Sequence, residues 1–181
     1  MFGRSSAHMQ SVSTQGTATR FTVRRMILED LEQVVTIDQL SFSLPWPAHS
    51  YRYELLENVV SRQWVAEIQS GEEASKVVGM IVVWLILDEA HIATIAVHPQ
   101  YRGRGIGQQM LLTALRECTN QGAASATLEV REHNQIAIAM YSKLGFEIVG
   151  RRKRYYKDTN EDAVLMTLKD LGLESITSLI G

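Results

Sequence analysis

The spacing of apolar residues divides the first part of the chain into short elements. Apolar and polar residues alternate over 21–24, which is typical of a half-buried strand. A helical pattern starts at the acidic pair 29–30, because negative charge stabilises the N-terminus of a helix. Pro45 and Pro47 end this pattern, since proline has no amide hydrogen for an inner helical turn. A second, short helix is predicted for residues 49–58.

Three consecutive strands are predicted in the middle of the chain. They cover residues 63–68, 76–87 and 91–97, and the second is rich in β-branched side chains, as central strands are. Polar turns at 70–75 and 88–89 separate them. Short connections of this kind favour an antiparallel meander.

The second half of the chain alternates helices with strands. A loop at 102–107 precedes a long amphipathic helix that ends near Gly122, and Asn134 is a suitable N-cap for a helix through Leu144. Strands are predicted at 127–131, 146–152 and 163–168. The order β-α-α-β-β-β-α-β-α-β-β indicates an α/β fold of mixed α+β character, in which helices cover the faces of a mixed sheet.

Length and composition fit one domain of a soluble globular protein. The chain has 181 residues, of which 45% are hydrophobic and 21% charged. Residues 1–20 are rich in Ser, Thr and Gln and are expected to form a disordered lead-in, residues 21–169 the domain and residues 170–181 a C-terminal tail. The net charge of -2 argues against nucleic-acid binding, and no apolar run is long enough to cross a membrane.

Cysteine and histidine usage narrows the chemistry further. Cys118 is the single cysteine, so an internal disulfide is excluded, a cysteine-based metal site is not expected, and the reducing cytoplasm is the expected location. His91, His98 and His133 show no metal-binding spacing, and we interpret them as residues of turns or strand surfaces. We therefore expect no bound metal.

The loop at 102–107 has the features of an anion site. The first amides of a helix point outward and, with the helix dipole, attract negative charge. Glycines let such amides approach a pyrophosphate, and Arg102 and Arg104 would add charge-assisted donors. The loop lacks the signatures GxxxxGK[ST] and GxGxxG, which indicates a phosphate-bearing ligand other than ATP or NAD. The alternative is a flexible surface turn with two solvated arginines.

Two segments together resemble a known enzyme family. Residues 91–107 resemble the acetyl-CoA-binding motif of the GNAT acetyltransferases, Q/R-x-x-G-x-G/A, which Arg102, Gly105 and Gly107 match. The stretch from Leu128 to Phe146 resembles the second half of the cofactor site in that family. Within the superfamily, the chain is most similar to RimI-type protein N-terminal acetyltransferases, and the resemblance covers about residues 21–168.

The resemblance implies a fold and a set of roles. The fold would be a twisted, mixed, mostly antiparallel sheet that splays open in its middle, with acetyl-CoA lying in the splay. The implied catalytic residues are Glu129 as general base and Tyr141 as general acid. The implied cofactor contacts are the backbone of Ile95, Ala96 and Val97 for the pantetheine arm, the segment Arg102, Gly103, Arg104, Gly105, Ile106, Gly107 and Gln108 for the pyrophosphate, and Asn134.

The residues themselves leave alternatives open for Glu129. On a strand at 127–131, Leu128 and Val130 face one side and Glu129 and Arg131 the other. Glu129 would then reach an amine directly or through a water, or it would be an ordinary surface glutamate paired with Arg131.

Tyr141 and Asn134 also have structural alternatives. They lie two helical turns apart on one face and so can address one ligand. Tyr141 would otherwise be a core aromatic beside Leu144 and Phe146, and Asn134 a plain helix cap.

The acceptor is less constrained than the cofactor. Trp46, Tyr155 and Tyr156 resemble residues that border the peptide entrance in the RimI group, and the alternative is packing for the tryptophan and exposure for the tyrosines. Cys118 is expected in the core, which favours direct attack in a ternary complex over an acetyl-cysteine. The resemblance implies acetyl transfer to the N-terminal α-amine of a protein such as a ribosomal protein. A small-molecule amine, a lysine side chain or a non-catalytic acetyl-CoA sensor are the alternatives.

Overall fold

The computed structural model describes residues 20–70 and 73–172 of the chain. Of the expected lead-in, residues 1–20, only Arg20 lies within these ranges. The expected tail lies outside them from residue 173 onward. Its first part packs on the domain, since Leu171 is buried and donates its amide to the Ala124 carbonyl at 2.8 Å.

The predicted order of helices and strands is confirmed. Two 3-10 turns are added to it, η1 (Leu28–Asp30) and η2 (Pro99–Tyr101). The other elements are β1 (Phe21–Arg25), α1 (Leu31–Ser41), α2 (Ala48–Leu56), β2 (Ser61–Ser70), β3 (Glu73–Ile86), β4 (Glu89–Val97), α3 (Ile106–Asn120), β5 (Ser125–Arg131), α4 (Gln135–Lys143), β6 (Glu147–Tyr156) and β7 (Glu161–Leu168).

Several boundaries differ from the predicted ones by a few residues, most visibly at two places. The polar turn predicted at 70–75 is wrong in its length, because β2 and β3 continue to a pairing of Ser70 with Glu73. The end of a hairpin can be held by backbone hydrogen bonds alone. It then shows no apolar pattern by which the sequence would reveal it. The strand predicted at 146–152 runs on to Tyr156 as β6, so the two tyrosines lie at its end.

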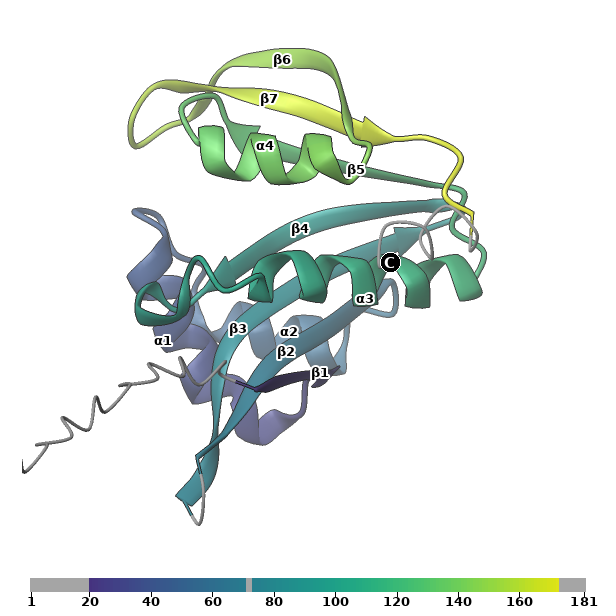
Figure 1. The fold of residues 1–181 in the computed structure, drawn as a ribbon. Coiled ribbons are helices and arrows are strands. Elements are labelled where there is room, and N and C mark those ends of the chain that lie inside the picture. The colour runs from purple at the N-terminus through teal and green to yellow at the C-terminus, as the bar shows by residue number, and fades with distance from the viewer. Residues whose placement is uncertain (1–19, 71–72, 173–181) are drawn as a thin grey trace, which may run out of the picture.

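The strands form one mixed, mostly antiparallel sheet in the order β1-β2-β3-β4-β5-β7-β6. Every neighbouring pair is antiparallel except β4 and β5, which are parallel. Helix α3 connects these two strands, as a parallel pair requires a crossover. The arrangement confirms the fold that the sequence predicted (Figure 1).

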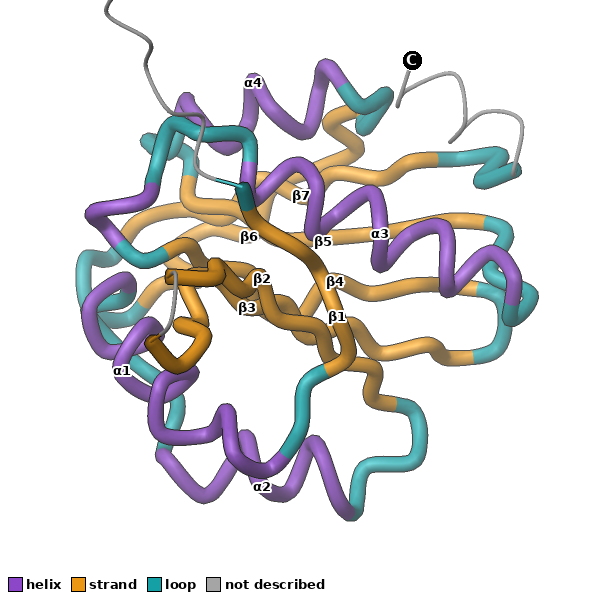
Figure 2. The backbone as a smooth tube through the Cα atoms, turned by 60° about the horizontal axis from the view of Figure 1, so that its bottom comes forward, coloured by secondary structure: helices purple, strands orange, loops and turns teal. Residues whose placement is uncertain are grey.

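Helices cover both faces of the sheet (Figure 2). They enclose two hydrophobic cores. One core lies under α3 and α4 and includes Met110, Leu111, Leu115 and Leu144, all at most 2% exposed. The other lies under α1 and α2 and is built around side chains such as Tyr51. Apolar side chains therefore hold each helix layer to the sheet. Their burial is the main contribution to the stability of the fold.

Strands β4 and β5 are paired along only part of their length. Their ladder runs from Glu89–Ser125 to Ile92–Leu128 and stops there, and Figure 1 shows the two strands diverging beyond it. A β-bulge coincides with this point, because Val82 and Val83 of β3 pair with Thr94 and Ile92 and leave Ala93 as an extra residue. A bulge bends a strand and increases its twist, so β4 turns away from β5.

Asp38 of α1 fixes the loop between α1 and α2. Its side chain is fully buried and accepts hydrogen bonds from the Tyr51 hydroxyl and the Trp46 amide, both at 2.7 Å. Burial raises the pKa of the Asp38 carboxyl, and the two hydrogen bonds act against this shift. One carboxylate thus ties α1, α2 and Trp46 together.

Replacing Asp38 by Ala should destabilise the protein, because two buried donors lose their acceptor. We expect the free energy of unfolding to fall by about 2–4 kcal/mol, measured by urea denaturation. Glu32→Ala, at an exposed position on the same helix, is the control and should change it by less than about 0.5 kcal/mol. Equal losses in the two variants would contradict the assigned role of Asp38.

Candidate active site

A cavity of about 600 Å³ opens where β4 and β5 part. Its lining comes from separated segments: residues 91–95 of β4, 128–131 of β5, residues of 41–46 at and after the end of α1, 155–158 at the β6–β7 turn, and also Trp84 of β3 with Asn134 and Tyr141 of the α4 region. Of the residues predicted for the site, the cavity brings together Trp46, Ile95, Glu129, Asn134, Tyr141, Tyr155 and Tyr156.

Glu129 points into this cavity from β5. Leu128 and Val130 are buried on the other face, as the alternation predicted. The Glu129 side chain is 13% exposed, and its Oε1 lies 2.9 Å from Nη1 of Arg152 while its Oε2 lies 3.4 Å from Nε2 of His91. The carboxylate is therefore held by neighbours that the sequence did not suggest, and the expected alternative partner, Arg131, pairs elsewhere.

Tyr141 combines the two interpretations that the sequence left open. Its ring is buried and packs against Phe146, with 5.8 Å between the ring centroids. The residue also lines the cavity. Burial raises the pKa of the Tyr141 phenol well above its ordinary value. The phenol is therefore protonated at neutral pH and available as a donor.

The loop before α3 has the backbone that an anion site needs. Gly103 and Gly105 both have φ of +75°, a conformation that side chains with a Cβ rarely adopt. Gly105 is the N-cap of α3, so the amides of Ile106, Gly107 and Gln108 are the outward-facing first amides of that helix. The residues of this loop do not line the cavity itself.

Gly107 places this loop beside the parted strands. A Cβ at Gly107 would lie 3.7 Å from Val97 of β4 and 3.9 Å from Met140 of α4. The N-terminus of α3 therefore sits between the end of β4 and helix α4, at one end of the opening.

The two arginines of the loop form hydrogen bonds to residues of neighbouring segments. Arg102 donates from Nε to the Val97 carbonyl at 3.0 Å and from Nη2 to the Ser41 hydroxyl at 3.1 Å. Arg104 donates to the Gln100 carbonyl at 3.3 Å. These bonds give both arginines a structural task besides the phosphate contact that the sequence predicted.

The backbone of β4 alternates between the two edges of the strand. His98 donates its amide to β3 at 2.8 Å. Successive residues turn their backbone groups to opposite edges, so Ala96 also faces β3 while Ile95 and Val97 face the opening toward β5. Ile95 and Val97 are thus placed to bond a ligand in the opening, whereas the backbone of Ala96 belongs to the sheet.

Asn134 is the N-cap of α4, as predicted. Its side-chain oxygen accepts the Ala137 amide at 3.2 Å. Since it also lines the cavity, the cap and a ligand contact are compatible.

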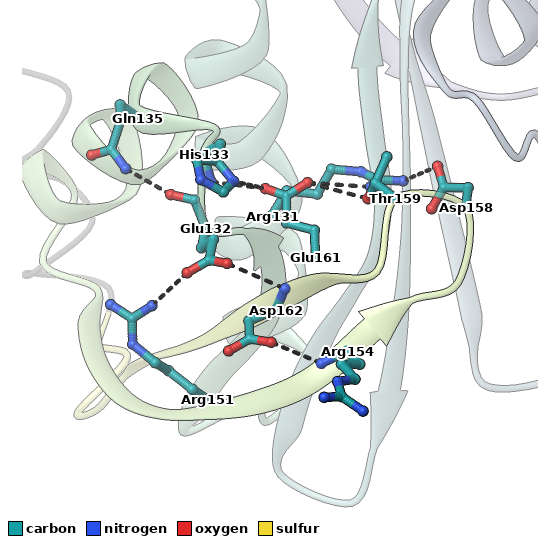
Figure 3. A network of polar contacts seen from close by, with 10 residues as sticks. All are labelled: Arg131, Glu132, His133, Gln135, Arg151, Arg154, Asp158, Thr159, Glu161 and Asp162. Carbon is teal, nitrogen blue, oxygen red and sulfur yellow. Dashed lines mark hydrogen bonds and ion pairs between the residues drawn. The ribbon is translucent and has the colours of Figure 1, made fainter.

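A polar network fixes the β6–β7 turn against β5 and the start of α4 (Figure 3). Arg131 donates to Asp158 at 2.7 Å and pairs with Glu161 at 3.4 Å, and its guanidinium lies 4.0 Å from the centroid of the Tyr156 ring. Hydrogen bonding to Ser43 and Arg131 lowers the pKa of Asp158. Because Ser43 follows α1 and Asp158 lies in the β6–β7 turn, the hydrogen bond between them joins these two walls of the cavity.

The floor of the cavity is a stack of aromatic rings. Trp46 stacks on Trp84 with 6.4 Å between centroids, and Trp84 stacks on His91 at 5.5 Å. His91 lies on the surface of β4, as the sequence reading allowed, and its ring lines the cavity. It alternates with the buried Ala90 and Ile92, which the sequence shows, and it pairs with Thr127 of β5, which the sequence does not show.

The described part of the chain shows two absences. Within residues 20–70 and 73–172, no three His, Cys, Asp or Glu side chains are grouped so as to hold a metal ion. Over the same ranges, no helix is long and apolar enough to span a membrane.

Comparisons with known proteins show which family the chain resembles. The acetyltransferase (GNAT) family matches residues 31–146. A Bacillus subtilis (strain 168) protein, provisionally named a [ribosomal protein bS18]-alanine N-acetyltransferase, is 38% identical over 148 residues, which cover 82% of this chain and 95% of that protein. The [ribosomal protein bS18]-alanine N-acetyltransferase of Escherichia coli (strain K12) is 32% identical over 149 residues, which cover 81% of this chain and 96% of that protein.

Solved structures show the same fold. The crystal structure of the ribosomal-protein-S18-alanine N-acetyltransferase from Escherichia coli matches with a TM-score of 0.73 and 29% identity, over 83% of this chain and 94% of that one. Arabidopsis thaliana NAA60 in complex with acetyl-CoA matches with a TM-score of 0.77 at 19% identity, over 84% of this chain and 100% of that one, and supports the fold alone.

Cys118 is predicted to have no part in the chemistry. It is fully buried on α3, outside the cavity lining, and burial raises the pKa of its thiol to about 11. The native protein should therefore resist a thiol reagent at neutral pH and react once unfolded in urea. Cys118→Ala should keep its kcat, and a loss of turnover with acetyl-CoA binding intact would instead indicate an acetyl-cysteine step.

Proposed function

The chain belongs to the acetyltransferase (GNAT) family, and from this premise we propose that it acetylates the N-terminal α-amine of a protein, with a ribosomal protein as the candidate substrate. Acetyl-CoA is the acetyl donor. The relatives named as bS18-alanine N-acetyltransferases support this choice of acceptor, because the chain matches nearly their whole length. A ribosomal substrate would be met in the cytoplasm.

The observation that carries the proposal is the set of residues that line the cavity. A carboxylate flanked by Arg152 and His91, a buried phenol and the gap-facing edge of β4 all border the same space. They correspond to the three needs of acetyl transfer to an amine: a proton acceptor, a proton donor for the leaving sulfur and amides near the reacting carbonyl.

The residues present fit acetyl-CoA. The first amides of α3, preceded by Gly103 and Gly105 in the left-handed conformation, would hold the pyrophosphate. The backbone of Ile95 and Val97 would bond the pantetheine arm along the open edge of β4. When bound, acetyl-CoA supplies the thioester that the amine attacks.

We assign the proton transfers to two side chains. Glu129 would take a proton from the α-ammonium, directly or through a water, which frees the lone pair for attack. The demand on this base is modest, because an α-amine has an ordinary pKa of about 7.7–8.0. Tyr141 would donate to the leaving thiolate, and a backbone amide of Ile95 or Val97 would polarise the carbonyl.

The peptide would enter between the walls that the aromatic residues form. Trp46 comes from the loop after α1, and Tyr155 and Tyr156 come from the end of β6 on the other side. Tyr156 is held by its stack with Arg131. Aromatic walls on both sides suit a short, extended chain terminus.

Short peptides with free N-termini should be acetylated and blocked ones should not. The measurement is release of free thiol from acetyl-CoA over a panel that varies the first residue. We expect turnover with peptides beginning in Ala or Ser and none with their N-terminally blocked counterparts. Turnover confined to polyamines or other small amines would overturn the proposal, as would acetyl-CoA binding with no turnover of any amine.

Glu129→Gln and Tyr141→Phe should each lower kcat by about 10²–10⁴-fold and leave acetyl-CoA affinity nearly unchanged. Each variant removes one proton transfer and keeps the shape of the side chain. Glu147→Gln and Tyr53→Phe, at exposed positions outside the cavity, are the matched controls and should retain full activity. Wild-type kcat in the two cavity variants would refute the assigned roles.

A further inference from the structure

A chain of hydrogen bonds crosses the paired part of β4 and β5 and ends at Glu129. The Thr127 hydroxyl donates to Oε1 of Glu89 at 3.1 Å, and Nδ1 of His91 lies 3.2 Å from Thr127 Oγ1. Nε2 of the same ring lies 3.4 Å from Oε2 of Glu129. His91 and Thr127 are register partners on the two strands, so the sheet itself sets this arrangement.

The donors along this chain determine which nitrogen of His91 carries the hydrogen. A carboxylate only accepts, so Thr127 gives its one hydroxyl hydrogen to Glu89. The Thr127 oxygen is then the acceptor for His91, and we assign the hydrogen of the neutral ring to Nδ1 on this basis. In the neutral ring, Nε2 therefore turns a lone pair toward Glu129.

Packing holds the ring in this orientation. Trp84 of β3 stacks on it at 5.5 Å, and the indole N–H of Trp84 is itself anchored on Glu54 of α2 at 2.9 Å. Arg152 of β6 holds the other oxygen of Glu129. The charged groups around His91 are thus Glu129 in front of Nε2, Arg152 behind that carboxylate, and Glu89 beyond Thr127, with Glu54 behind the tryptophan.

Two acceptors that face one another across 3.4 Å make a place for one proton. Resting on the proposed function, we propose that His91 is a positioning residue that acts through Glu129: Glu129 accepts the proton of the substrate ammonium, and Nε2 of His91 shares it. Thr127 and Glu89 set the tautomer that makes this pairing work. Glu89 is exposed and connects the pair to solvent.

The proton balance of the reaction fits such a pair. An ammonium has to lose two protons to become an amide, while the thiolate gains one. The pair takes the first proton, the amine lone pair forms the C–N bond, and the C–S bond breaks. The second amine proton passes to Tyr141 and restores the phenol that has given its own proton to the sulfur. The proton left on the pair is the net product and leaves along Nδ1, Thr127 and Glu89.

The tautomer can be read by ¹⁵N NMR of the histidine rings in the full chain, without any substrate. His91→Gln identifies the His91 signals among those of the five histidines. We expect the neutral ring to carry its hydrogen on Nδ1 and to move it to Nε2 in Thr127→Val. Thr167→Val is the matched control, because Thr167 of β7 pairs with Thr127 on the opposite side of β5 from His91. A wild-type ring protonated on Nε2, or no change in Thr127→Val, would overturn the proposal.

The kinetic test uses His91→Gln, whose amide still donates to Glu129 but takes up no proton. We expect kcat to fall by about 10²-fold with the KM for acetyl-CoA unchanged. The pH profile of kcat should change as well, because the amide that replaces the imidazole cannot share a proton with Glu129. An unchanged profile with unchanged kcat would overturn the proposal. Failure of the wild-type enzyme to acetylate any peptide would contradict the proposed function instead, and the tautomer measurement separates the two cases.

Discussion

The separation of β4 from β5 is the constraint on which the rest of the site depends. The two strands pair over four residues each and then part at the bulge of Ala93. A backbone edge that would normally bond a neighbouring strand is thereby turned toward a cavity, and Ile95 and Val97 lie on it. Backbone donors and acceptors of this kind need a partner. The parting therefore creates both the space for a ligand and the groups that bind it.

Opening a sheet weakens it, so the two halves must be held in other ways. On one side, the buried carboxylate of Asp38 fixes α1, α2 and Trp46 to one another. On the other, Arg131 ties the β6–β7 turn to the end of β5. The bond between Ser43 and Asp158 then links the two sides across the mouth of the cavity. The catalytic groups that we propose lie between these contacts, which fix the positions of the segments that carry them.

Local sequence patterns predicted much of this architecture. Alternation at 127–131 placed Glu129 on the open face of its strand, Asn134 was recognised as a helix cap, and the glycines at 103 and 105 have the left-handed conformation that only glycine adopts easily. These features depend on neighbours in the chain. For that reason the order of elements was confirmed while the ends of β2, β3 and β6 were misjudged by a few residues.

The features that the sequence did not predict are contacts between distant segments. His91 and Arg152 lie 38 and 23 residues from Glu129 along the chain, and only the pairing of β4 with β5, of β5 with β7 and of β7 with β6 brings all three together. The bulge at Ala93 depends likewise on how β3 and β4 pair. The acceptors of Arg102, the Val97 carbonyl and the Ser41 hydroxyl, likewise come together only in the fold, so the sequence predicts the phosphate contact and not these bonds.

The central claim is that this cavity transfers acetyl to an α-amine. The most direct measurement offers the enzyme a peptide that begins with Ala and contains an internal lysine, and locates the acetyl group by fragmentation mass spectrometry. Acetyl on the N-terminal amine, with the lysine unmodified, is the predicted result. Acetyl on the lysine with a free N-terminus would contradict the account.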